Sequence, residues 1–101
     1  MMQTIQAKTR KVYELYRPKG LAKPTPTCWR GLFMAQRLVD LLTYEGYEAE
    51  CCKVRVGPQG HHCVKVTKGS QVITADPSIA QFYPSAGYLC REGHPEELYN
   101  V

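Results

Sequence analysis

The sequence predicts an α+β fold in which a central helix, bearing a candidate nucleophile, packs against a small antiparallel sheet. Apolar residues repeat at steps of three and four between residues 28 and 45, as they do on one face of a helix. Three later stretches, residues 47–56, 61–66 and 71–75, have the composition of short strands and are separated by glycine or proline turns. A chain of 101 residues has room for one hydrophobic core, so we expect a single domain over residues 1–101.

A first helix is expected over residues 3–16, where Ile5 and Val12 stand among charged residues and Pro18 ends the pattern. Residues 17–27 contain three prolines and a glycine, which predicts an extended connector. This connector leads directly into the central helix.

The central helix is expected to run from Cys28 to Glu45, with Thr27 as its N-cap and Gly46 just beyond its C-terminus. Its buried stripe is expected to contain Cys28, Leu32, Ala35, Val39 and Leu42, widened by Leu38 and Leu41. Cys28 is therefore placed at the start of a helix and on its buried face.

A two-residue loop of Lys68 and Gly69 is expected to join the second and third strands. Antiparallel pairing then places His61 directly opposite Asp76, with Cβ atoms about 5 Å apart. Both side chains fall on the more polar face of the hairpin, whereas His62 falls on the mostly apolar face. Short helical turns are expected later in the chain, over residues 79–82 and 95–98.

Cys28, His61 and Asp76 are the residue types of a thiol-dependent catalytic triad, in the chain order that such enzymes use. A helix start and a nearby imidazole lower the pKa of a thiol below its ordinary value of about 8.5, which frees the thiolate to attack a carbonyl. His61 is expected to act as acid and base, and Asp76 to orient its ring. The backbone N–H of Cys28 is expected to donate to the oxyanion, and no second donor is evident in the sequence.

The chain resembles the papain-like and transglutaminase-like superfamily of cysteine enzymes. The resemblance rests on Cys28-Trp29 before a leucine-rich helix, on residues 41–49, on the histidine strand at residues 61–66 and on the aspartate strand at residues 72–78. It implies a papain-like core with Cys28, His61 and Asp76 as catalytic residues, and it points to His61 with His62 as the alternate base. The chain departs from the family in having no glutamine shortly before Cys28 and in lacking most of the second lobe of larger members.

The resemblance implies a thiol-dependent acyl-transfer enzyme, a hydrolase acting on amide bonds of proteins as a glutamine deamidase, a peptidase or a toxin or effector. A protein or peptide substrate is the expected partner, with a regulatory or inhibitory protein as a further candidate. The net charge of +4 comes mostly from the N-terminal region and favours an acidic partner surface. Five cysteines, an odd number, favour a reducing compartment, so we expect a cytoplasmic protein or one delivered into a host or target cell.

The sequence also bears on other functions. A non-catalytic protein-binding module on the same fold is the main alternative. A zinc site would need ligands such as Cys51 and Cys52, but adjacent cysteines point to opposite faces of a strand and the sequence contains no C-x-x-C spacing, so we expect no metal ion and no cofactor. Nucleic acid is not an expected partner because no RRM, KH or helix-turn-helix pattern is present. A membrane is not expected either, because no apolar run approaches the roughly 20 residues that span a bilayer.

Overall fold

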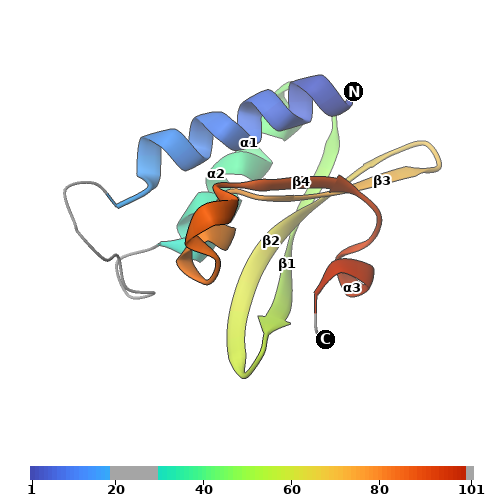
Figure 1. Ribbon diagram of the computed structural model, residues 1–101. Helices are drawn as coiled ribbons and strands as arrows, with labels where there is room; N and C mark the ends of the chain where they lie inside the picture. Colours follow the sequence, from blue (N-terminus) through green and yellow to red (C-terminus); the bar gives the residue numbers. More distant parts are fainter. Residues whose placement is uncertain (19–29, 100–101) are drawn as a thin grey trace.

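The computed structural model describes residues 1–18 and 30–99, and these form an α+β fold (Figure 1). Two helices precede an antiparallel sheet of four strands in the order β1-β2-β3-β4. The elements are α1 (Met2–Tyr16), α2 (Gly31–Tyr44), β1 (Glu48–Val56), β2 (Gln59–Lys68), β3 (Gln71–Asp76), η2 (Ile79–Gln81), η3 (Pro84–Ala86), β4 (Leu89–Glu92) and α3 (Pro95–Leu98). Neither α1 nor α2, nor any other helix within the described ranges, has both the length and the apolar character needed to cross a membrane.

The core lies between the two long helices and one face of the sheet. It is built from apolar side chains that are fully buried, namely Ile5, Val12, Met34, Ala35, Leu38, Leu42, Val64, Val66, Ile73 and Ala75. The strand positions in this set alternate along the chain, as expected for a sheet that turns one face to its helices. Burying a valine, leucine or isoleucine side chain contributes about 1.5–3 kcal/mol, so this layer is the main source of stability.

Helix α1 confirms the first predicted helix. Its buried residues are Ile5, Thr9 and Val12, which follow one another at steps of four and three. Thr9 lies within this apolar stripe because its hydroxyl donates a hydrogen bond to the carbonyl oxygen of Ile5 at 2.7 Å. The polar group is thereby satisfied inside the core.

Helix α2 differs from the predicted central helix at its start. Arg30 precedes it with φ −108° and ψ 65°, outside the helical region, and the described helix begins at Gly31. The predicted start at Cys28 and the predicted N-cap at Thr27 lie outside the described residues. Leu32 is 45% exposed, so its placement in the buried stripe is wrong.

The buried face of α2 explains the error. Met34, Leu38 and Leu42 follow one another at steps of four and form its centre, with Ala35 beside them. Leu32 lies roughly 200° around the helix from Met34, since each residue advances by about 100°. Helical spacing alone fitted two overlapping stripes, and packing against α1 and the sheet selected one of them.

The C-terminal end of α2 agrees with the prediction. Gly46 has a φ of 92°, a left-handed conformation that glycine adopts without a steric penalty. Its N–H donates to the carbonyl of Thr43, and the N–H of Tyr47 donates to the carbonyl of Leu42, both at 3.0 Å. These are the two hydrogen bonds of a Schellman motif, which ends the helix and turns the chain into β1.

The loop between β2 and β3 consists of Gly69 and Ser70, because Lys68 pairs with Gln71. The predicted loop of Lys68 and Gly69 is therefore wrong. The first residue of a two-residue hairpin loop needs a positive φ, and Gly69 supplies it at 62° where a lysine would be strained.

The corrected register moves β3 by two residues relative to β2. Val64 faces Ala75, so His61 is not directly opposite Asp76 as predicted. A shift of two residues leaves every side chain on its original face, whereas a shift of one would have exchanged the faces. His61 and Asp76 therefore still share a face, and the alternation places Cys63 nearest to Asp76 along the ladder.

Strand β4, like the 3-10 helix η3, is not singled out by the sequence pattern. It pairs with β3 so that Asp76 faces Leu89 and Thr74 faces Arg91, which places β3 inside the sheet. The hydroxyl of Thr74 donates to the carbonyl of Gly93 at 2.9 Å and fixes the chain at the end of β4. The two predicted helical turns are confirmed as the 3-10 helix η2 and as α3, which begins with Pro95.

Candidate active site

A buried histidine and a buried aspartate form the centre of the site. His61, near the start of β2, is 3% exposed, and Asp76, the last residue of β3, is 0% exposed. The imidazole Nε2 lies 2.7 Å from the carboxylate Oδ2. The hydrogen bond expected between these two residues is present, because the register shift left both on one face.

Four donors surround the carboxylate of Asp76. Its Oδ1 accepts from the backbone N–H of Ser78 at 3.0 Å and from the Ser78 hydroxyl at 3.4 Å. Its Oδ2 accepts from His61 and from the hydroxyl of Tyr99 at 2.5 Å. The bond to the N–H two residues onward is the local pattern that an aspartate before a turn forms. Together the donors offset the loss of solvent around a fully buried acidic group.

The other imidazole nitrogen faces the start of α2. The side-chain Nε2 of Gln81 lies 3.1 Å from Nδ1 of His61. With the amide nitrogen toward the ring, its N–H donates to Nδ1, and the ring proton is then on Nε2, where it is bonded to Asp76. The ring edge also contacts Phe82, with ring centroids 5.1 Å apart and planes at 88°.

Gly31, the first residue of α2, closes the site on the Nδ1 side. A Cβ atom added at Gly31 would lie 3.2 Å from Nε2 of Gln81 and 3.9 Å from Nδ1 of His61. The helix start thus lies against the basic nitrogen of His61. Any larger side chain at this position would crowd the amide.

Only some of the predicted site residues lie at this centre. The structure brings His61 to Asp76, while His62, the alternate base, lies beside Lys53 on β1. Burial, His61 and Lys53 lower the pKa of His62 below its ordinary value. Cys28 and its backbone N–H, the proposed nucleophile and oxyanion donor, lie outside the described residues.

The four described cysteines are in surroundings that disfavour the thiolate. Cys63 is fully buried, and burial followed by the charge of Asp76 raises its pKa. Burial raises the pKa of Cys90 to about 11 and also raises the pKa values of Cys51 and Cys52. These thiols are therefore weak nucleophiles near neutral pH. Within residues 1–18 and 30–99, no group of three or more His, Cys, Asp or Glu side chains could hold a metal ion.

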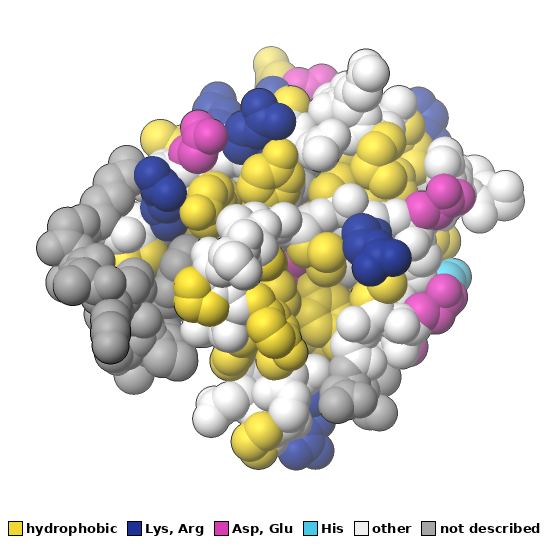
Figure 2. All heavy atoms as spheres, in the orientation of Figure 1, with side chains coloured by type: hydrophobic (Ala, Val, Ile, Leu, Met, Phe, Trp, Pro, Cys, Tyr) yellow, Lys and Arg dark blue, Asp and Glu magenta, His cyan; other side chains and the backbone are white. Residues whose placement is uncertain are grey.

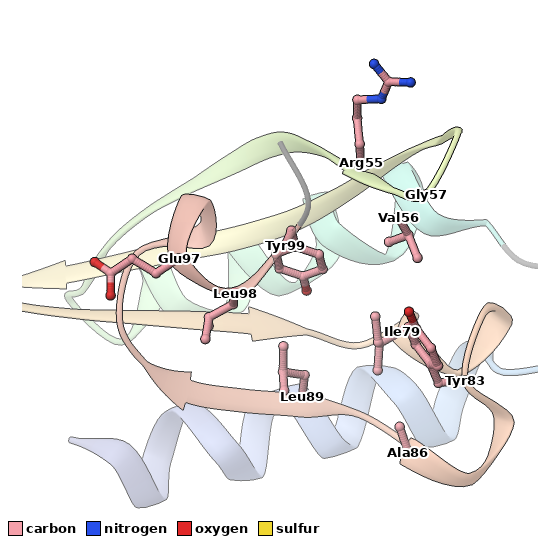
Figure 3. A pocket seen from close by; sticks show the side chains of 10 residues that line it. All are labelled: Arg55, Val56, Gly57, Ile79, Tyr83, Ala86, Leu89, Glu97, Leu98 and Tyr99. Atoms are coloured by element: carbon pink, nitrogen blue, oxygen red, sulfur yellow. The ribbon is translucent and has the colours of Figure 1, made fainter.

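A cavity of about 540 Å³ lies beside the carboxylate side of the site (Figure 3). Tyr99 belongs to both, because it lines the cavity and donates to Asp76. The lining is Arg55, Val56, Gly57, Ile79, Tyr83, Ala86, Leu89, Glu97, Leu98 and Tyr99. Figure 3 shows the charged ends of Arg55 and Glu97 pointing away, so most of the side chains left to line the interior are aliphatic or aromatic.

The basic residues of α1 are partly engaged in contacts within the chain. Lys8 forms an ion pair with Glu45 at 3.3 Å, and Arg10 Nε donates to the hydroxyl of Tyr88 at 3.1 Å. On the face drawn in Figure 2, hydrophobic and acidic side chains separate the basic ones. The positive charge on this face is therefore dispersed.

The stability of the protein is expected to fall above about pH 9 because of Tyr99 and Cys63. Burial, chiefly, raises the pKa of both groups. The folded state therefore keeps their protons at a pH at which the unfolded chain, with ordinary tyrosine and thiol pKa values of about 10 and 8.5, loses them. Unfolding then releases protons, and each group lowers the unfolding free energy by up to about 1.4 kcal/mol per pH unit. Urea titrations from pH 7 to 11 measure this slope.

Two variants test whether Tyr99 contributes to the fall of the unfolding free energy with pH. Tyr99→Phe should reduce the alkaline loss, whereas Tyr44→Phe, at a ring that is 89% exposed, should leave it unchanged. An unfolding free energy that stays constant to pH 11 would contradict the prediction.

Several site residues are not predicted by the sequence pattern. Gln81 and Tyr99 carry no motif and reach the site only through η2 and the end of α3, while Ser78 follows an Asp-Pro pair that signals a turn. Comparison of the chain with protein-family models, with curated proteins and with solved structures gives no match.

Proposed function

We propose that the protein is a thiol-dependent acyl-transfer enzyme that acts on amide bonds of protein substrates, with a papain-like core. The observation that carries the proposal is the orientation of the two nitrogens of the buried His61 ring. Its Nε2 is bonded to Asp76, and its Nδ1 faces the first residue of α2. A histidine oriented in this way can exchange a proton with a thiol that precedes the helix.

The short segment between Cys28 and Gly31 supports Cys28 as that thiol. Three peptide units join Cys28 to Gly31, and an extended chain spans at most about 3.6 Å per residue, so the two Cα atoms lie within about 11 Å. A Cβ added at Gly31 would lie 3.9 Å from Nδ1 of His61. This connectivity is compatible with the proposed approach of the Cys28 thiol to Nδ1.

The proposed reaction begins when Nδ1 of His61 accepts the thiol proton of Cys28. The thiolate attacks the amide carbonyl, and the backbone N–H of Cys28 donates to the oxyanion. The protonated Nδ1 then gives its proton to the leaving amine, which leaves an acyl-enzyme. Water or a second amine, activated by the neutral Nδ1, releases the acyl group, while Asp76 holds the ring.

The acceptor and the position of the amide decide the product. Attack on a glutamine side chain followed by water releases ammonia and leaves glutamate, whereas attack on the backbone cleaves the peptide. We propose a folded protein as the substrate, as for a deamidase or a toxin or effector. A folded target brings its own complementary surface to the site.

Cys28 is expected to react with iodoacetamide faster than the other four thiols. At pH 6.5 a thiol with the ordinary pKa of about 8.5 is about 1% thiolate, and a pKa of 6.5 would raise that fraction about 50-fold. Cys51, Cys52, Cys63 and Cys90 have raised pKa values and should label more slowly still. Brief labelling followed by mass-spectrometric mapping measures the rates.

Cys28→Ser is the control, and it should remove the fast phase while leaving the slow labelling unchanged. Equal labelling of all five thiols would overturn the proposal of an activated nucleophile. A non-catalytic binding module on this fold would then be the better explanation.

A further inference from the structure

The side-chain amide of Gln81 contacts Nδ1 of His61, the nitrogen that exchanges protons in the proposed reaction. Its amide Nε2 lies 3.1 Å from Nδ1 of His61 and 3.5 Å from the hydroxyl oxygen of Ser78. Gln81 ends η2, and the two preceding residues, Ile79 and Ala80, are buried and anchor this turn. The amide therefore reaches the site from a fixed backbone.

The contact is compatible with only one protonation state of the ring. With Nδ1 neutral, the amide N–H donates to its lone pair. Once Nδ1 carries a proton, two donors face each other and the hydrogen bond is lost. Proton transfer from a thiol, and later to the leaving amine, takes place at this same nitrogen.

We propose that Gln81 is a positioning residue that caps Nδ1 of His61 in the resting site and must turn away, or turn its carbonyl oxygen toward the ring, before proton exchange. The proposal rests on the function proposed above. It assigns to Gln81 two effects on His61: the Nε2–H tautomer is favoured, and the neutral ring is stabilised relative to the imidazolium. The alternative partner for the amide is already in place, since Ser78 lies beside it.

The other groups around His61 lie mainly on the opposite side of the ring. Asp76 from β3 is bonded to Nε2, the ring centroid of Tyr99 is 6.1 Å away, and His62 and Cys63 follow in β2. On the Nδ1 side, α2 presents Gly31, which has no side chain. The preceding Arg30 places its guanidinium 4.1 Å from the ring centroid of Phe33. Gln81 is thus the polar side chain that bonds Nδ1 among the described residues.

The test is the titration of the His61 ring, followed by nitrogen NMR in a Cys28→Ala background so that no thiol titrates with it. Gln81→Met keeps the approximate shape of the side chain and removes the donor, and it should raise the midpoint by about 0.4 to 1 pH unit. Gln81→Glu places an acceptor at Nδ1 and should raise the midpoint further. The matched control, Gln36→Met on the exposed face of α2, should leave it unchanged.

Alkylation of Cys28 in the Gln81→Met variant separates this proposal from the proposed function. If both hold, labelling at pH 6 should be several-fold faster than in the unmodified chain, because the imidazolium beside the thiolate is favoured. A raised His61 midpoint without fast labelling would retain the role of Gln81 and reject Cys28 as an activated nucleophile. A His61 midpoint that is the same in Gln81→Met and Gln81→Glu as in the unsubstituted protein would overturn the proposed role of Gln81.

Discussion

Asp76→Ala is expected to lower the unfolding free energy by about 3–5 kcal/mol. The change leaves the Nε2–H of His61, the hydroxyl of Tyr99 and the N–H of Ser78 without their acceptor in the interior. Each unsatisfied buried donor costs about 1–3 kcal/mol, less what water entering the space recovers. Urea unfolding at pH 7 measures the difference.

Asp40→Ala is the matched control for this prediction. Asp40 is an aspartate on the exposed side of α2 with a side chain that is 69% exposed and paired with Arg37 at 3.7 Å. Exposed pairs of this kind contribute at most about 1 kcal/mol. If Asp76→Ala lowers the unfolding free energy no more than Asp40→Ala does, the hydrogen bonds from the four donors to the carboxylate do not stabilise the fold.

Asp76→Asn tests the orienting role with a smaller change in packing. If the amide oxygen accepts from Ser78, the amide nitrogen faces His61 and Tyr99, which are both donors. The ring can then satisfy the amide only by carrying its proton on Nδ1, which is the nitrogen that accepts the thiol proton in the proposed reaction. A wrong tautomer of this kind lowers the rate of a Ser-His-Asp enzyme about 10⁴-fold, so we expect a loss of that order in Cys28-dependent activity.

His61→Ala is expected to abolish the fast labelling of Cys28, whereas His62→Ala is expected to preserve it. His61 bears the nitrogen that faces the start of α2, and His62 lies beside Lys53 on β1. Without an imidazolium partner, the thiolate fraction should return toward that of an ordinary thiol, a loss of about 50-fold at pH 6.5. Iodoacetamide labelling of both variants measures it.

The adjacent histidine makes this comparison a close control, since both substitutions remove the same atoms from neighbouring positions of β2. Loss of fast labelling in His62→Ala with retention in His61→Ala would assign the base to the other face of the strand. Thermal unfolding of both variants excludes the trivial case in which the protein fails to fold.

The sequence alone predicts that His61 and Asp76 lie together, because their meeting depends on the alternation of side chains along a strand. A strand alternates its faces every residue, so His61 and Asp76 remain on one face under any even shift of register. The error in the β2 to β3 loop was an even shift, and the hydrogen bond between the two side chains is present at 2.7 Å. The alternation of a strand does not indicate which residues of other segments bond the ring or the carboxylate, so it predicts neither Gln81 nor Tyr99.

Elements whose signals are local are predicted correctly by the sequence pattern. Apolar spacing located α1, the glycine at position 46 ended α2, and Pro95 opened α3. These features depend on backbone conformations and side-chain periods within a few residues, which is why pattern alone predicts them.

Features that depend on contacts between distant segments follow only from the folded chain. Packing against α1 and the sheet selected the buried stripe of α2 and left Leu32 exposed, although spacing alone allowed it inside. Pairing with β3 made a strand of residues 89–92, and the return of the chain brought Tyr99 to a carboxylate 23 residues earlier. Such contacts form because buried polar groups require partners and apolar faces require cover, and only the folded chain determines which segments supply them.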